Sequence, residues 1–152
     1  MDKVGRRWAI AAMAWGTLYV ASKVHHALTG RLGVTGGPAV EPAAYASYRP
    51  GGVALAQWGN AGIGVLGVAL VALPLLPVAQ RLRRWVLLLP LCAFALMALG
   101  GGLVMLIRAL VTDVGGAAFG AYCLVWSALI AMTARAVANR RLPRSPSSLP
   151  AT

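Results

Sequence analysis

Four long apolar stretches alternate with polar segments along the chain. They cover residues 8–27, 53–77, 85–107 and 117–138. Each is close to the ~20 residues that cross a hydrocarbon core as an α-helix. Their Leu, Ala and Met content favours helices over barrel strands, in which polarity alternates from residue to residue. The pattern predicts an all-α fold, an integral membrane four-helix bundle that makes several passes through the cell membrane.

Composition agrees with a membrane protein. Hydrophobic residues make up 59% of the 152 residues, against roughly 45–50% in soluble domains. Four spans leave too little chain for a soluble domain, so we expect residues 1–139 to form one transmembrane domain. Residues 140–152 are basic and rich in Pro and Ser, and we expect them to form a disordered tail.

Basic residues fall unequally on the two sides of this bundle. Ten lie on one side: Lys3, Arg6, Arg7, Arg81, Arg83, Arg84, Arg135, Arg140, Arg141 and Arg144. Four lie on the other: Lys23, Arg31, Arg49 and Arg108. Because cytoplasmic segments carry the excess of Lys and Arg, both termini are predicted to be cytoplasmic. The net charge of +11 then lies at membrane boundaries, so we expect the lipid bilayer as a partner and no nucleic acid.

Polar residues gather at the outer end of the first span. Tyr19, Ser22, Lys23 and His26 are spaced by three, four and seven residues, so they share one helix face. His25 points about 100° away from His26. Two interpretations fit this group. It is either an interfacial cluster whose tyrosine belongs to an aromatic belt, or the polar rim of an internal pocket.

The outer loop between the first two spans is dense in Gly and Pro and is predicted to be irregular, with at most one short helix near residues 41–48. Pro42 suits the first turn of that helix, with Glu41 just before it. A loop of this length often folds back over a bundle as a cap.

The second span opens with Gln57, Trp58 and Asn60 before it becomes wholly apolar. Gln57 and Asn60 share a face, where they would serve either interhelical hydrogen bonds or ligand contacts. Gly64 and Gly67 continue from Asn60 as a smooth stripe, which favours the close approach of another helix.

The last two spans carry a charged pair and a polar seam. Arg108 and Asp113 lie five residues apart at the outer boundary, either as a structural ion pair or as an acid held near a pocket mouth. In the last span Tyr122, Trp126 and Thr133 are spaced by four and seven residues, so this seam should face the bundle.

The segment HHALTGRLGVTGGP, together with IRALVTD followed by AYCL, resembles a family of small bacterial four-helix integral membrane proteins of unknown function. Members share a histidine near the end of the first helix, an Ala-x-Gly-Gly-Arg-x-Gly turn, and an Arg and an Asp around the last two helices. The chain has Thr29 where a glycine is usual and His26 near a usual aromatic residue. The resemblance implies the four-helix layout and no activity. The corresponding positions are His25 or His26, Ala27, Gly30, Arg31, Gly33, Arg108 and Asp113.

The outer polar residues favour a membrane-embedded enzyme that applies carboxylic acid and histidine chemistry to an apolar or prenylated small molecule. A carboxyl group desolvated there would stay protonated and could protonate an alkene or epoxide, after which aromatic faces would stabilise a carbocation. Terpenoid cyclisation or isomerisation is the sharpest version, without cofactor or metal. The expected catalytic residues are Glu41, Asp113 and His26. The expected substrate-binding residues are Tyr19, His25, Gln57, Trp58, Asn60, Arg108, Tyr122 and Trp126.

Two other functions remain open. One is a non-catalytic subunit or small transporter component, in which the outer rim fixes a partner or lines a passage; a homo-oligomer is compatible with it. The central parts of the last three spans carry no charge, which disfavours coupled transport. The other is a purely structural or assembly protein.

Overall fold

The computed structural model describes residues 2–140, and this part of the chain is helical as expected. The expected tail falls outside the described residues except for Arg140. The only backbone pairing of the β type within them is an isolated bridge between Pro38 and Gly115. The elements are α1 (Lys3–Leu28), α2 (Pro42–Tyr45), α3 (Gly52–Ala72), the 3-10 turns η1 (Leu73–Leu75) and η2 (Pro77–Gln80), α4 (Arg84–Val111) and α5 (Ala117–Ala138).

Within residues 2–140, three helices are long and apolar enough to cross a membrane. They are Gly52–Leu75, Arg84–Val111 and Ala117–Ala138. Helix α1 has 26 residues, which is long enough, but its polar outer end with Ser22, Lys23, His25 and His26 makes it less apolar. Membrane crossing by α1, which would make four spans, therefore stays a prediction.

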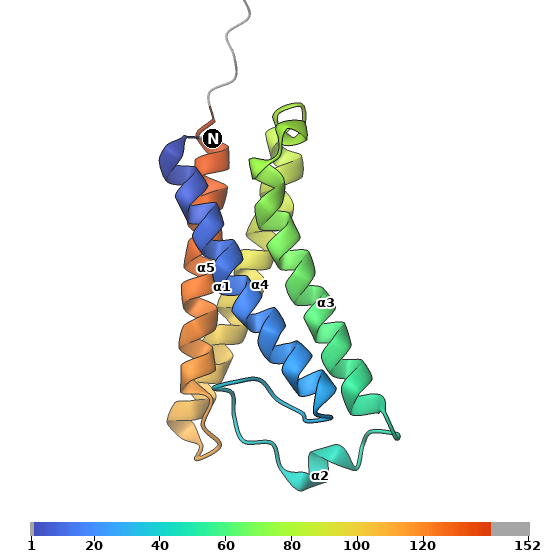
Figure 1. Cartoon of the computed structure of the whole chain (residues 1–152). Coiled ribbons are helices and arrows are strands. Elements are labelled where there is room, and N and C mark those ends of the chain that lie inside the picture. Colours follow the sequence, from blue (N-terminus) through green and yellow to red (C-terminus); the bar gives the residue numbers. More distant parts are fainter. Residues whose placement is uncertain (1, 141–152) are drawn as a thin grey trace, which may run out of the picture.

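The four long helices form two pairs (Figure 1). Helix α1 packs along α3, and α4 packs along α5. Contacts between α1 and α5 join the pairs, whereas α3 and α4 touch little. Residues 29–51, which include α2, and the α4–α5 turn lie together at one end, which we call the loop end. The opposite end carries the start of α1, η1, η2 and the end of α5, and we call it the basic end.

Small residues let α1 approach both of its neighbours. Gly5, Ala9, Ala12 and Gly16 are buried at helical spacing along one face. A Cβ atom added to Gly16 would lie 2.6 Å from Cζ2 of Trp126 and 2.9 Å from Cγ2 of Val68. Because lipid provides little hydrophobic drive for helices to associate, close packing of this kind must supply much of the stability.

The glycine stripe predicted on α3 is confirmed as a packing surface. A Cβ at Gly64 would lie 2.7 Å from Cδ1 of Tyr19 on α1, and one at Gly67 would overlap the ring of Phe94 on α4. Only glycine therefore allows these helices their present separation.

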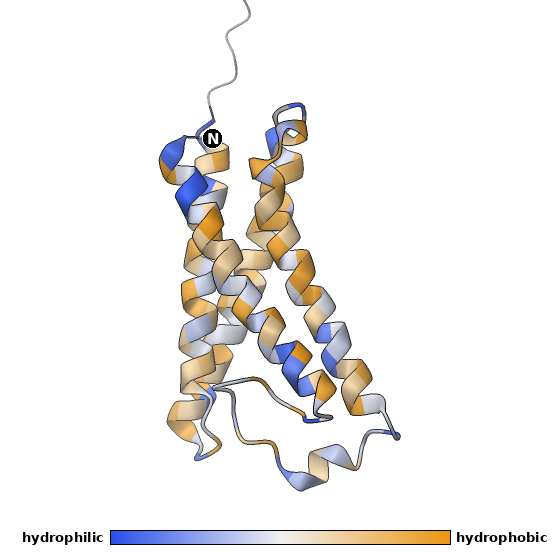
Figure 2. Cartoon of the chain, in the orientation of Figure 1, coloured by the Kyte–Doolittle hydropathy of each residue, from blue (hydrophilic) through white to orange (hydrophobic). Residues whose placement is uncertain are grey.

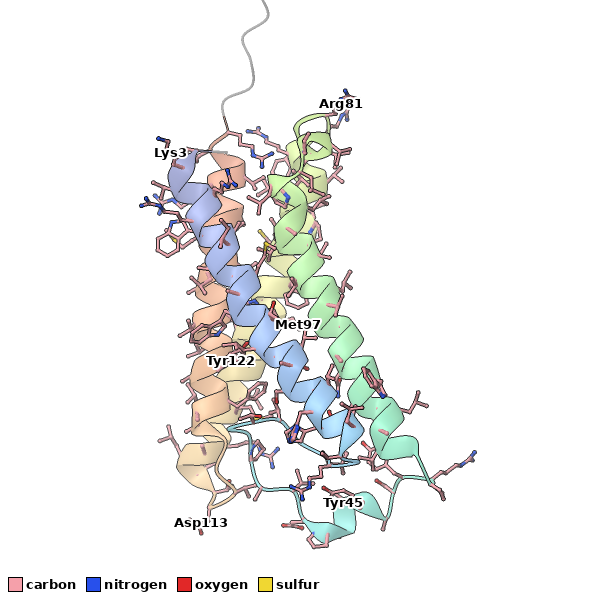
Figure 3. All side chains as sticks on the ribbon, viewed as in Figure 1. Lys3, Tyr45, Arg81, Met97, Asp113 and Tyr122 are labelled. Carbon is pink, nitrogen blue, oxygen red and sulfur yellow. The ribbon has the colours of Figure 1, made fainter. Side chains whose placement is uncertain are left out.

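Apolar residues form a band between two polar ends (Figure 2). Helix α4 exposes many large apolar side chains, which fits contact with lipid tails: Leu89, Leu96, Met97, Leu103, Val104, Ile107 and Leu110. Figure 3 places Lys3 and Arg81 at the basic end, and Tyr45 and Asp113 at the loop end. Lys3 and Arg81 thus lie at the opposite end from Asp113, as the sequence predicts, while the cytoplasmic placement of the termini stays a prediction.

We expect Gly102→Ala in α4 to destabilise the protein relative to Gly101→Ala. A Cβ at Gly102 would lie 3.0 Å from the carbonyl oxygen of Gly120 and 3.1 Å from Cβ of Cys123, whereas nothing lies within 4 Å of one at Gly101. Both variants gain the same helix propensity, so their difference isolates overpacking, which costs about 1–3 kcal/mol. Thermal or SDS unfolding followed by circular dichroism measures it. Equal stability of the two variants would contradict the packing described here.

Candidate functional site

The loop between α1 and α3 is attached to the start of α5. The amide of Phe119 donates to the carbonyl oxygen of Gly36 at 3.0 Å, and the amide of Ala39 donates to that of Val114 at 2.9 Å. Gly36 has a φ of +72°, a conformation that strongly favours glycine. The loop therefore crosses the loop end from the α1–α3 pair to the α4–α5 pair (Figure 1).

Polar side chains of α1 and α3 hold the same loop from the other side. Ser22 Oγ donates to Thr35 Oγ1 and accepts from the Thr35 amide, both at 2.9 Å. Lys23 Nζ donates to the carbonyl oxygen of Gly33 at 2.8 Å. Gln57 Nε2 donates to the carbonyl oxygens of Arg31 at 2.9 Å and Gly33 at 3.0 Å. Two residues of the polar face predicted on the first span, Ser22 and Lys23, thus bind the chain's own loop.

Ser22, Lys23 and Gln57 form a polar cluster under the loop, and Lys23 is its charged and buried member. Its side chain is buried, with 8% exposed, and its Nζ lies 5.6 Å from the centroid of the Tyr19 ring. Within residues 2–140 no carboxylate oxygen lies within the 4.0 Å limit of an ion pair with it. Gln57 is 2% exposed, and its Oε1 is buried with no hydrogen-bond donor in the described part of the chain.

Aromatic side chains link this cluster to the centre of the bundle. The ring centroids of Tyr19 and Trp126 are 5.8 Å apart, and those of Trp15 and Tyr122 are 5.1 Å apart. Trp126 Nε1 donates to the carbonyl oxygen of Ala12 at 3.1 Å, and Tyr122 Oη donates to that of Trp15. The predicted seam of the last span therefore does face the bundle, and its hydrogen bonds tie α5 to α1.

Sequence reasoning missed three members of the aromatic cluster around Tyr19, Tyr122 and Trp126. Phe119 packs against both Tyr19 and Tyr122, Phe94 makes an edge contact with Trp126, and Trp15 stacks on Tyr122. Trp15 precedes Tyr19 by four residues and Phe119 precedes Tyr122 by three, so helical spacing could have revealed them. Phe94 carries no comparable signal.

The two carboxylates expected to be catalytic lie on the surface. Glu41 is exposed at the N-cap of α2, where its side chain makes no capping hydrogen bond, although the predicted start of that helix at Pro42 is confirmed. Asp113 is exposed in the α4–α5 turn. The structural ion pair between Arg108 and Asp113 is absent among residues 2–140. The reason is that α4 ends at Val111 and Thr112 is extended, with φ −140° and ψ 153°.

The remaining candidates are dispersed. His25, Trp58 and Arg108 are exposed, with 47% of Trp58 accessible, and Asn60 is half-buried. His26 is half-buried, and its Nδ1 lies 2.8 Å from the carbonyl oxygen of Ser22. Across residues 2–140 no group of three or more His, Cys, Asp or Glu side chains could hold a metal ion. The structure thus joins Tyr19, Tyr122 and Trp126 in one cluster, and Gln57 with Lys23 in another.

Comparison with protein-family models, curated proteins and solved structures finds no match for this chain. The resemblance to the four-helix membrane family therefore stays a prediction.

Gln57→Leu should loosen the loop between α1 and α3. The variant removes the side-chain donor of the Arg31 carbonyl oxygen and one of the two donors of the Gly33 carbonyl oxygen, which keeps its bond to Lys23. Leaving the Arg31 carbonyl oxygen unpaired costs about 1–3 kcal/mol, so hydrogen exchange at the Thr35 and Ala39 amides should accelerate by roughly 10- to 100-fold.

Asn60→Leu on the same helix is the matched control, because no hydrogen bond ties that side chain to the loop within the described residues. Similar exchange in both variants would show that Gln57 does not hold the loop.

Proposed function

We propose that the protein is a non-catalytic subunit of the cell membrane, with four spans, that presents its loop end to a protein partner. One observation carries this proposal. The side chains of Ser22, Lys23 and Gln57 at the loop end bind the first part of the chain's own loop. Residues 41–50 of that loop are all exposed. We call residues 41–50 the cap.

The cap is linked to the rest of the loop by one side-chain hydrogen bond and carries side chains suited to binding a protein. Tyr45 and Tyr48 are 36% and 40% exposed, and Glu41 and Arg49 of the same segment are exposed as well. Tyr and Arg are enriched among the residues that dominate protein interfaces. The Leu32 amide donates to Tyr45 Oη at 3.1 Å, which ties α2 to the first part of the loop. A cap ordered before binding loses less conformational entropy on association.

The packing of α1 supports its assignment as a fourth span. At 1.5 Å per residue its 26 residues extend about 39 Å, against about 30 Å of hydrocarbon. Helix α1 crosses from α5 at the basic end to α3 at the loop end and packs against both, so a bilayer around those two helices would also enclose α1 (Figure 1). The excess of basic residues at the end that carries the N-terminus favours a cytoplasmic location for both termini.

Acid–base catalysis on a lipophilic molecule has less support. Protonating an alkene requires a carboxyl group held protonated by desolvation, and both Glu41 and Asp113 are exposed. Neither side chain hydrogen-bonds to His26 within the described residues. Terpenoid cyclisation or isomerisation by these residues is therefore the competing hypothesis.

A photo-cross-linking amino acid at Ala46 in the cap tests the proposal in intact membranes. We expect a discrete cross-linked species whose mass identifies one protein partner, either another chain or a second copy. Tyr48→Ala should lower its yield by roughly tenfold or more, since loss of an interface aromatic often costs above ~1.4 kcal/mol. Trp85→Ala is the matched control, because Trp85 is 60% exposed at the basic end.

No cross-linked species from Ala46, or one unaffected by Tyr48→Ala, would overturn the proposal. Turnover of a lipophilic substrate that disappears in Glu41→Gln/Asp113→Asn would then establish the enzyme.

A further inference from the structure

The amino group of Lys23 lies buried at the loop end with no carboxylate of the described residues beside it. Its ammonium group has three N–H donors. One donates to the carbonyl oxygen of Gly33, and the group also lies over the Tyr19 ring, which offers a weak attraction to a cation. Among residues 2–140 no carboxylate pairs with it. A buried charge of this kind is costly, so a compensating group from outside the chain would stabilise the site.

Gln57 has a hydrogen-bond acceptor without a donor close to Lys23. Both N–H groups of its amide have carbonyl acceptors, which fixes the orientation of the amide because a flipped oxygen would face two carbonyl oxygens. Oε1 is left buried and without a donor among residues 2–140. An unpaired buried acceptor also costs free energy.

Lys23 Nζ and Gln57 Nε2 both donate to the carbonyl oxygen of Gly33. It lies 2.8 Å from Lys23 Nζ and 3.0 Å from Gln57 Nε2, so the unneutralised cation and the unsatisfied amide flank one atom. The geometry points to a binding site at Lys23 and Gln57 for an anionic phosphodiester that carries a free hydroxyl, the head-group chemistry of phosphatidylglycerol. The phosphate oxygen accepts from Lys23, and the hydroxyl donates to Gln57 Oε1.

The depth of the site favours a lipid head group as the occupant. Lys23 lies five residues before the end of α1 at Leu28, and Gln57 lies five residues after the start of α3 at Gly52. At 1.5 Å per residue, both are about 8 Å inside the helix ends, near the boundary between hydrocarbon and head groups. A water molecule could satisfy Gln57 but would leave the charge of Lys23 unneutralised.

Native mass spectrometry from phosphatidylcholine nanodiscs tests the site. The nanodiscs contain equal small fractions of phosphatidylglycerol and phosphatidylmethanol, which has the same phosphodiester and no hydroxyl. We expect the protein to retain phosphatidylglycerol most strongly. Lys23→Met should weaken retention of both anionic lipids by roughly 10- to 100-fold, as expected for a hydrogen bond to a charged group. Gln57→Leu should abolish the preference for phosphatidylglycerol over phosphatidylmethanol while phosphatidylmethanol is still retained, whereas loss of both lipids would reflect the loosened loop.

Two lysine variants keep the test independent of folding. Lys23→Arg retains the cation and should retain anionic lipid, and Lys3→Met removes a lysine at the basic end and should bind as wild type. Gel filtration and circular dichroism confirm the fold of each variant.

Three results would overturn the inference. They are equal retention of phosphatidylcholine and phosphatidylglycerol by the wild type, equal losses in Lys23→Met and Lys3→Met, and full competition by glycerophosphoglycerol, the same head group without acyl chains. The last result would assign the site to a soluble anion.

Discussion

The close approach of α1 to α3 and α5 at Gly16 is the constraint on which the arrangement of the helices depends. The missing side chain of Gly16 leaves the space that Trp126 of α5 and Val68 of α3 occupy. At Gly16, α1 therefore contacts both its partner α3 and α5 of the other pair. Because lipid tails are as apolar as the side chains, burial alone does little to hold these helices together. Packing at this level, with the hydrogen bond from the Trp126 indole to Ala12, supplies the attraction.

The organisation of the loop end follows from that pairing. Packing of α1 along α3 brings Lys23 and Gln57 to the same level, so both reach the carbonyl oxygen of Gly33. The loop then continues to the start of α5, where Phe119 and Val114 bind it through the backbone. The loop thereby connects the two helix pairs at the end where α3 and α4 make little contact.

Sequence reasoning predicted the regular parts of the fold well, because hydrophobic pattern and proline chemistry act locally. The stretch expected over 53–77 is found as Gly52–Leu75, and the one over 117–138 as Ala117–Ala138. Pro42 begins α2 as expected from its preference for the first helical turn. The polar face that joins Tyr19, Lys23 and His26 is also predictable, since spacings of four and seven residues along a helix determine it.

The site could be predicted only in part, because its partners are set by the path of the loop. No local pattern indicates that Lys23 binds a backbone carbonyl ten residues later, or that Gln57 binds the same atom. Glu41 and Asp113 were predicted to be desolvated catalytic acids because both fall at the same end of the bundle. Their exposure depends on where α2 begins and where α4 ends. Nothing in the sequence alone distinguished a side chain near the membrane boundary from one inside the cluster.

The division into two helix pairs also has a consequence for biosynthesis. Each pair is made of helices that are neighbours in the order of synthesis among the long helices, α1 with α3 and α4 with α5. Chains emerge from the ribosome with the N-terminal part first, so α1 and α3 can associate before α4 is complete. The contacts between α1 and α5 join the first helix made to the last. Docking of the α4–α5 pair onto the α1–α3 pair must therefore wait until the ribosome has finished α5. Until then, the part of the small-residue face of α1 that packs against α5 contacts lipid or the insertion machinery.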